Sequence, residues 1–230
     1  MPKEELTKSP VGGTLVDRVY EKLEDGILSQ KYRKGEALIE MNISADLGVS
    51  RTPVREAIRM LEQKGLVETH PHKGAVVVGI SRKDMEDIYA IRMYVEGLAA
   101  KWAAKNITEA QMQALTEIVD LQEFYQIKNS SEKINELDSR FHAQIFQYSG
   151  SRTLQHILSE LHHMIQWFRE LSIKTEGRAE KAINEHREIL SALEARDQDL
   201  AERLTVGHIM NAWENLSKQL ENEERDGAPA

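Results

Sequence analysis

Apolar residues between positions 15 and 65 recur every three or four residues, which is the spacing of one buried helix face. The first such stretch covers residues 15–28, and a shorter one covers residues 40–47. A third helix is expected to begin near residue 50 and to end at Gly65, because glycine suits the position after a helix. The first third of the chain is therefore predicted to be mainly helical.

Two short apolar runs, LVETH and AVVVG, follow the third helix and have the composition of strands. They are separated by Pro71, His72, Lys73 and Gly74, which predicts a hairpin. Three helices and a hairpin have the outline of a winged helix-turn-helix, which we assign to residues 14–79. Residues 1–13 are expected to be a flexible tail.

The pattern changes after Gly79, because residues 72–228 contain no proline and few glycines. Thr108 and Gln111 have the spacing of a capping box at a helix start. The sequence predicts an all-helical bundle over residues 80–222, followed by a tail at 223–230, so the fold class is mainly α. The predicted helices cover residues 81–105, a stretch beginning at 108, and residues 131–149, 151–175, 178–195 and 197–222, the last capped by Asp197.

A net charge of −8 is unfavourable for binding nucleic acid, but this charge is unevenly distributed along the chain. Residues 1–79 contain twelve basic and twelve acidic residues, so the excess of acid lies entirely in residues 80–230. A neutral half with clustered arginines is compatible with local phosphate contacts. The chain has no cysteine, no signal-peptide pattern and no apolar run long enough to span a bilayer, so we expect a cytoplasmic protein without a membrane partner.

Three arginines lie four residues apart in the third helix, at Arg51, Arg55 and Arg59, and therefore share one face. In a helix-turn-helix the second helix of the motif enters the major groove, where arginine can bond guanine with two donors. Ser50 and Thr52 can cap this helix or bond phosphate. The alternative is an ordinary solvated face, but the helix-turn-helix-hairpin order favours DNA binding.

The stretch EALIEMNISADLGVSRTPVREAIRMLEQKGLVETHPHKGAVVV closely resembles the DNA-binding domain of the GntR family of bacterial transcription regulators. The resemblance implies a homodimer on double-stranded operator DNA with two-fold symmetry. It implies that Arg51, Thr52 and Arg55 contact DNA, with Arg59 and the wing residues His72, Lys73 and Gly74 nearby. Ile43 and Ser44 replace a usual Leu-Ala pair of the family, which should affect only packing.

Four titratable residues of the helical region fall on predicted apolar faces: Asp138, His142, His186 and His208. Burying unpaired charge is costly, so these groups should either pair with each other or bind a metal. Three imidazoles and one carboxylate suit Zn, Ni, Fe, Mn or Cu, and without thiolates the choice stays open, with Zn preferred. The alternative is that each histidine is a hydrogen-bonded core residue that binds no metal. Another histidine, His162, borders an apolar face and is a weaker candidate for the same site.

DIYAIRMYVEGLAA resembles the opening of the effector domain in the FadR-like branch of the same family, called the FCD domain. The spacing of Asp138, His142, His186 and His208 is similar to the metal-binding pattern of that domain. The resemblance implies that the metal helps bind a small organic or sugar acid. It also implies that Arg92 faces the acid, although a salt bridge with Glu96 is an equal alternative; Arg169 could reach inward too.

The predicted function is therefore a transcription regulator whose DNA affinity is controlled by an acid bound at a metal site. One alternative is a metal-dependent hydrolase with an appended DNA-binding domain, because a metal with open positions can activate water. The sequence has no HExxH motif and no clearly placed general base, either of which would support the hydrolase alternative. We therefore expect that the protein is not an enzyme. A second alternative keeps the regulator but gives the metal only a structural role.

Overall fold

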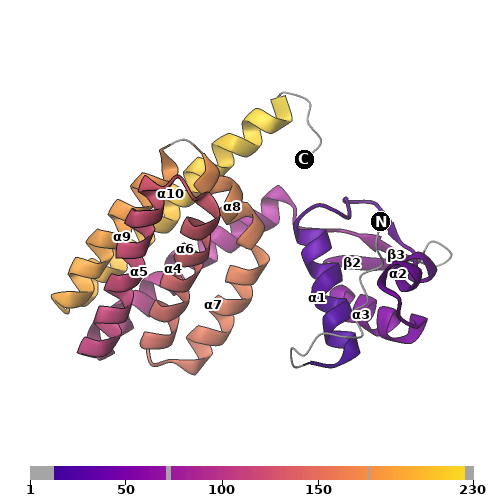
Figure 1. Ribbon diagram of the computed structural model, residues 1–230, viewed down its shortest axis with the longest axis horizontal. Coiled ribbons are helices and arrows are strands. Elements are labelled where there is room, and N and C mark those ends of the chain that lie inside the picture. The colour runs from indigo at the N-terminus through magenta and orange to yellow at the C-terminus, as the bar shows by residue number, and fades with distance from the viewer. Residues whose placement is uncertain (1–12, 71–73, 176, 226–230) are drawn as a thin grey trace. The chain divides into compact units, whose positions relative to one another are not determined.

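The computed structural model describes residues 13–70, 74–175 and 177–225 (Figure 1). The chain divides into two compact units, Met1–Arg82 and Lys83–Ala230, which are described separately below. The predicted fold class is confirmed: helices dominate, and the strands are confined to a small sheet in the N-terminal unit. No helix in the described part of the chain combines the length and apolar character needed to cross a membrane.

The N-terminal unit contains three helices and a small antiparallel sheet of strand order β1-β3-β2. The predicted hairpin is present, with Val67 opposite Val77 and His70 opposite Gly74. The sequence did not indicate β1, which pairs with β3 and is only two residues long, too short to show alternation. The elements are α1 (Leu15–Leu28), β1 (Ala37–Leu38), α2 (Glu40–Leu47), α3 (Arg51–Gln63), β2 (Val67–His70) and β3 (Gly74–Val77).

The core of this unit forms where α1 packs against α3 under the sheet. Val19, Val54 and Leu61 are completely buried there. Gly48 ends α2 with a φ of +66°, a left-handed conformation that glycine adopts without steric cost. The tight turn at Gly48 places the start of α3 directly after α2, as a helix-turn-helix requires.

The C-terminal unit is entirely helical in the described residues, and its helices pack into one bundle. Two predicted caps are confirmed: Thr108 and Gln111 form a capping box at the start of α5, and Asp197 accepts a hydrogen bond from the backbone N–H of Leu200. The helices are α4 (Arg82–Asn106), α5 (Glu109–Ile127), α6 (Ser131–Tyr148), α7 (Arg152–Met164), α8 (Gln166–Lys174), α9 (Arg178–Glu194) and α10 (Gln198–Arg225).

The prediction of one continuous helix over residues 151–175 is wrong, because the helix breaks at Ile165 into α7 and α8. No glycine or proline marks the break, and Ile165 is completely buried. After the break α8 contacts α6, α9 and α10, so tertiary packing redirects the chain where local sequence would continue the helix.

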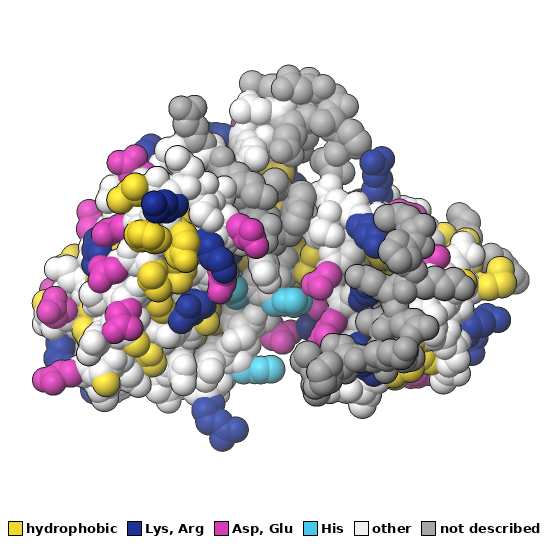
Figure 2. All heavy atoms as spheres, in the orientation of Figure 1, with side chains coloured by type: hydrophobic (Ala, Val, Ile, Leu, Met, Phe, Trp, Pro, Cys, Tyr) yellow, Lys and Arg dark blue, Asp and Glu magenta, His cyan; other side chains and the backbone are white. Residues whose placement is uncertain are grey.

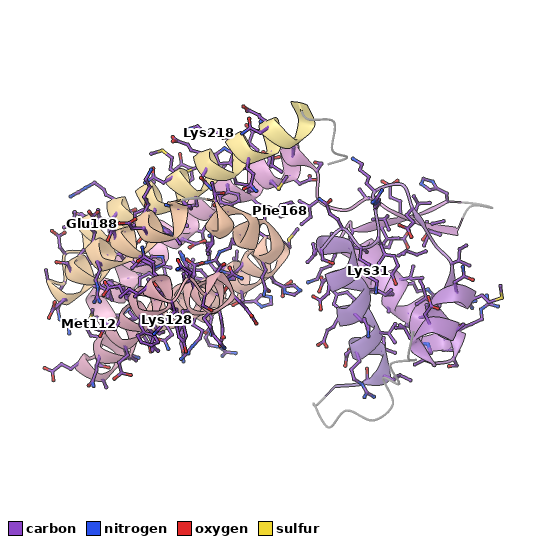
Figure 3. All side chains as sticks on the ribbon, turned by 45° about the horizontal axis from the view of Figure 1, so that its top comes forward. Lys31, Met112, Lys128, Phe168, Glu188 and Lys218 are labelled. Atoms are coloured by element: carbon purple, nitrogen blue, oxygen red, sulfur yellow. The ribbon has the colours of Figure 1, made fainter. Side chains whose placement is uncertain are left out.

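The outer face of the bundle carries charged side chains of both signs. Figure 2 shows acidic side chains over this unit, interspersed with basic and hydrophobic ones. Glu188 of α9 and Lys218 of α10, labelled in Figure 3, are exposed, whereas their neighbours Ile189 and Leu216 are completely buried. Most positions facing outward are thus polar, whereas a second set of charged residues, including Glu96, Asp138 and Arg169, is buried inside the bundle.

Candidate functional site

The third helix has two distinct faces. Its apolar stripe is buried, with Val54, Ala57 and Leu61 all completely inaccessible to solvent. The three arginines of the opposite stripe stay exposed, with 60%, 52% and 63% of the side-chain surface accessible at Arg51, Arg55 and Arg59. One face of α3 therefore anchors the helix while the other presents guanidinium groups to solvent.

The arginines are exposed but each is ion-paired. Glu40, the first residue of α2, accepts hydrogen bonds from Nε and Nη2 of Arg55 and from Nη2 of Arg51, each at 2.9 Å. These bonds, chiefly that from Arg55, lower the pKa of Glu40 to about 2. Arg59 pairs with Glu56 at 2.8 Å. Glu40 was not predicted from the sequence, because a contact across eleven to fifteen residues leaves no local pattern.

The other predicted DNA-contacting residues are also placed at the surface where the structure describes them. Ser50 occupies the N-cap position of α3 but its side chain makes no capping bond, contrary to one of its two predicted roles. Ser50, Thr52 and Gly74 are exposed. His72 and Lys73 lie outside the described residues. The hydroxyls of Ser50 and Thr52 are thus available to an external acceptor or donor.

The second site is a buried cluster in the C-terminal unit. Asp138 and His142 come from α6, His186 from α9 and His208 from α10, and all four are buried. One ligand atom from each residue lies within 4.8 Å of the others. The structure therefore brings together the four residues that were predicted to share a site, from positions 70 residues apart in the chain.

Each imidazole is held from outside the cluster by its Nδ1 atom. Nδ1 of His142 lies 2.9 Å from Oε2 of Glu96, and Nδ1 of His208 lies 2.7 Å from Oε2 of Glu185. Nδ1 of His186 lies 2.9 Å from the side-chain oxygen Oε1 of Gln122. Since these partner oxygens accept, each Nδ1 carries the proton and donates, which leaves each Nε2 with a lone pair.

The three lone pairs point toward one another, and this arrangement fits a cation. Nε2 of His142 and Nε2 of His208 are 3.2 Å apart. Nε2 of His186 is buried and has no hydrogen-bond partner among the residues that the structure describes. Oδ1 of Asp138 lies 3.6 Å from Nε2 of His186. Acceptor atoms that face one another are unfavourable without a cation between them. Histidines that bind a metal usually donate Nδ1–H to an outer acceptor and keep Nε2 free for the metal, which is the arrangement here.

The charge states of these groups also suit a metal. Burial lowers the pKa of His142 to about 4, although the Glu96 carboxylate opposes the shift. Burial lowers the pKa of His186 well below its usual value. Burial disfavours the Asp138 carboxylate, but the positive charge of Arg169, which donates to it, outweighs burial and lowers the pKa of Asp138. Neutral imidazoles and an ionised carboxylate are the forms that bind metals.

Both predicted effector-binding arginines are buried beside the cluster. Arg92 donates from Nε to Glu96 at 2.5 Å, so the predicted salt bridge exists, and Arg92 also lines a cavity next to the cluster. Arg169 donates to Oδ2 of Asp138 and contacts His162. The cavity has a volume of about 20 Å³ and is lined by Tyr89, Arg92, Asp138, His142, Arg169, Ser172, Ile173, Arg178, Ala182, His208 and Ala212.

Several residues of this site were not singled out from the sequence. Tyr89 and Arg178 line the cavity, and Gln122 and Glu185 orient histidines. Glu185 lies directly before His186, and a carboxylate beside a buried histidine could have been noticed. His162 does approach the cluster, with its ring centre 6.0 Å from that of His142, as its position bordering an apolar face suggested.

Each of the two units matches a known protein family. The family model "Bacterial regulatory proteins, gntR family" covers residues 15–77, and the model "FCD domain" covers residues 87–211. The chain is 29% identical over 204 residues to the "Uncharacterized HTH-type transcriptional regulator YdhC" of Bacillus subtilis, covering 88% of this chain and 91% of that protein.

It is also 29% identical over 209 residues to the "HTH-type transcriptional repressor RspR" of Escherichia coli, covering 91% of each chain. The solved structure of E. coli McbR/YncC shares the fold, with a TM-score of 0.72 at 23% identity over 91% of this chain and all of that one. These families are regulators and not enzymes, which excludes the hydrolase alternative. The chain belongs to the GntR family of bacterial regulatory proteins and is a DNA-binding transcription regulator with a C-terminal FCD domain.

Proposed function

We propose that this regulator reads a symmetric operator through α3 and the wing, and that a small organic acid bound at the buried cluster controls its DNA affinity. The observation that carries the proposal is the convergence of three Nε2 lone pairs and a carboxylate beside a cavity lined by arginines. We expect the protein to act in the cytoplasm as a homodimer. We also expect it to repress transcription, because the printed name of the relative RspR is that of a transcriptional repressor.

The exposed arginine stripe supports the DNA-binding part of the proposal. A guanidinium group can donate two parallel hydrogen bonds to the O6 and N7 atoms of guanine. Arg51 and Arg55 are the base-reading candidates, while Ser50, Thr52 and Arg59 contact phosphate or neighbouring bases. His72, Lys73 and Gly74 of the wing complete the DNA-contacting set.

A divalent transition metal, with Zn as first choice and Ni, Mn or Fe as alternatives, would be held by Asp138, His142, His186 and His208. When bound, it supplies a Lewis acid that coordinates a carboxylate of the effector. Arg169 holds Oδ2 of Asp138 and thereby leaves Oδ1 directed at the histidines. Glu96, Gln122 and Glu185 fix the imidazole rings from outside.

The cavity beside the cluster is suited to a small anion. The hydroxyl of Tyr89 and Nη1 of Arg92 are buried there and have no hydrogen-bond partner among the described residues. A carboxylate would accept from Nη1 of Arg92 and from Arg169, since guanidinium matches carboxylate geometry. These donors favour a carboxylic or sugar acid over a neutral ligand.

The size of the cavity suggests how the effector acts. A volume of about 20 Å³ holds little more than one water, so an acid must displace lining side chains to enter. Arg169, Ser172 and Ile173 all lie on α8, which makes this short helix the element to move. A change in the bundle would reach the DNA-binding unit through residues 78–83. A tenfold change in DNA affinity requires about 1.4 kcal/mol of coupling.

A thermal-shift screen of small carboxylic and sugar acids tests the effector part. The screen compares metal-loaded and metal-stripped full-length protein, because a ligand that binds the folded state raises its melting temperature. We expect a shift that requires both the metal and His186, and its loss in His186→Ala. The exposed His156 provides the control His156→Ala, which should keep the shift. A metal that raises the melting temperature while no acid does so would support the structural-metal alternative.

A further inference from the structure

The carboxylate of Glu40 occupies an unusual position, because it holds both of the arginines that we assign to base reading. Arg55 engages it side-on, with Nε donating to Oε1 and Nη2 donating to Oε2, each at 2.9 Å. Arg51 donates from Nη2 to the same Oε2 atom, also at 2.9 Å. Glu40 lies on α2 and the arginines lie on α3, so the contact joins the two helices of the motif.

This pairing determines which donors of Arg55 remain available. A guanidinium group has five N–H donors in one rigid plane. The bonds to Glu40 use the Nε hydrogen and one Nη2 hydrogen, which leaves the end edge formed by Nη1 and Nη2 free. That edge has two parallel donors, the pattern that matches O6 and N7 of guanine. Because the group is planar, fixing one edge also fixes the direction of the other.

The same carboxylate alters the charge of the DNA-binding face. Arg51 and Arg55 are 60% and 52% exposed and could otherwise turn toward any phosphate within reach. The negative charge of Glu40 offsets one of their two positive charges and weakens sequence-independent attraction to the DNA backbone. Without Glu40, Arg51 and Arg55 would bind phosphate on every DNA sequence. When Glu40 restrains them, binding is favoured only where a guanine lies in line with their free donors.

We propose that Glu40 is a positioning residue that sets the sequence specificity of this regulator by orienting Arg51 and Arg55 and limiting their contacts with phosphate. The inference rests on the proposed role of Arg51 and Arg55 in DNA binding, and it adds a residue that need not touch DNA. The measured quantity is the specificity ratio, which is the affinity for a specific duplex divided by the affinity for a shuffled one.

The experiment uses full-length protein and two duplexes. The specific duplex is the sequence that the wild-type chain enriches from a randomised DNA pool, and the second has the same bases in shuffled order. In Glu40→Gln the shape is kept but the charge and the second acceptor oxygen are lost. We expect tighter binding to the shuffled duplex and a specificity ratio that falls about tenfold, the discrimination of one bidentate arginine-guanine contact.

Two further variants separate positioning from charge. Asp46→Asn removes the same charge from the same helix at an exposed site, and should leave the specificity ratio unchanged. Glu40→Asp keeps the charge but shortens the side chain by one methylene, so the side-on pairing with Arg55 is lost. Glu40→Asp should therefore lower the specificity ratio. It takes the place of Glu40→Gln if circular dichroism shows that Glu40→Gln does not fold.

The outcomes distinguish this inference from the proposed function. Equal effects of Glu40→Gln and Asp46→Asn would show a general charge effect and overturn the inference, as would equal weakening on both duplexes. If Arg55→Ala abolishes binding to the specific duplex while Glu40→Gln leaves the ratio unchanged, only the positioning role is wrong. If Arg55→Ala changes nothing, or if no sequence is enriched, the proposed reading helix itself is wrong.

Discussion

Single residues of α3 carry the proposed contact with DNA, and Arg55 is the one whose loss should be most severe. Arg55→Ala removes the two donors at the end edge of the guanidinium group. The free energy of operator binding should therefore weaken by about 1–3 kcal/mol, and the preference for guanine at one base pair should be relaxed. Fluorescence anisotropy with a labelled operator duplex measures the change. Arg33→Ala removes the same charge from an exposed position before α2 and should have a much smaller effect. Equal losses in the two variants would contradict a specific contact.

Residues outside the buried cluster should also tune its proposed metal affinity. Glu185 accepts from Nδ1 of His208 at 2.7 Å, and Glu185→Gln weakens that orientation and the basicity of the ring. We expect metal affinity to fall about 10- to 100-fold, measured by competition with a chromogenic chelator. Glu188→Gln on the exposed face of the same helix should leave the affinity unchanged. An unchanged affinity in Glu185→Gln would exclude a role for this outer contact.

Local chemistry was predictable at the residue scale, but pairing across the chain was not. Asp138 and the three histidines were found because polar residues on an apolar stripe are conspicuous in a sequence. Glu40, Glu96 and Gln122 look like ordinary helix residues, and their partners lie between 11 and 64 residues away. Such contacts follow from the packing of helices, which the local pattern does not specify.

Helix starts were the best predicted features at the element scale, and one of them gives a stability test. Thr108 accepts from the backbone N–H of Gln111 at the start of α5. Thr108→Ala should lower the free energy of unfolding by about 1 kcal/mol. Ser130 precedes α6 without a side-chain capping bond, so Ser130→Ala should cost less. Urea unfolding followed by circular dichroism compares the two, and equal costs would show that the cap contributes little.

The boundary between α7 and α8 shows what the helix pattern leaves undetermined. Apolar spacing continues from α7 into α8, yet the chain breaks at the buried Ile165 without glycine or proline. The break matters for function, because α8 carries Arg169, Ser172 and Ile173 on the cavity wall. A regular helix over this stretch would have been favoured locally, and the contacts of α8 with α6, α9 and α10 override that preference.

At the scale of the whole molecule, three features were predictable from the sequence: the mainly helical fold class, the order of three helices and a hairpin, and the helical bundle. Those features follow from local periodicity, turn residues and a recognisable family motif. Dimerisation and the coupling between effector and DNA depend on surfaces and movements that local patterns do not encode. Regulation by an effector therefore requires that an acid at the buried cluster changes DNA binding by the full-length chain.

The most direct measurement is operator affinity of the full-length protein in four states: metal-loaded or chelator-stripped, each with and without the acid identified by thermal shift. We predict at least a tenfold change on adding the acid to the metal-loaded protein, about 1.4 kcal/mol of coupling, and little change in the stripped protein or in His186→Ala. An operator affinity that is the same in all four states, with the acid bound, would contradict control of DNA binding through the metal centre.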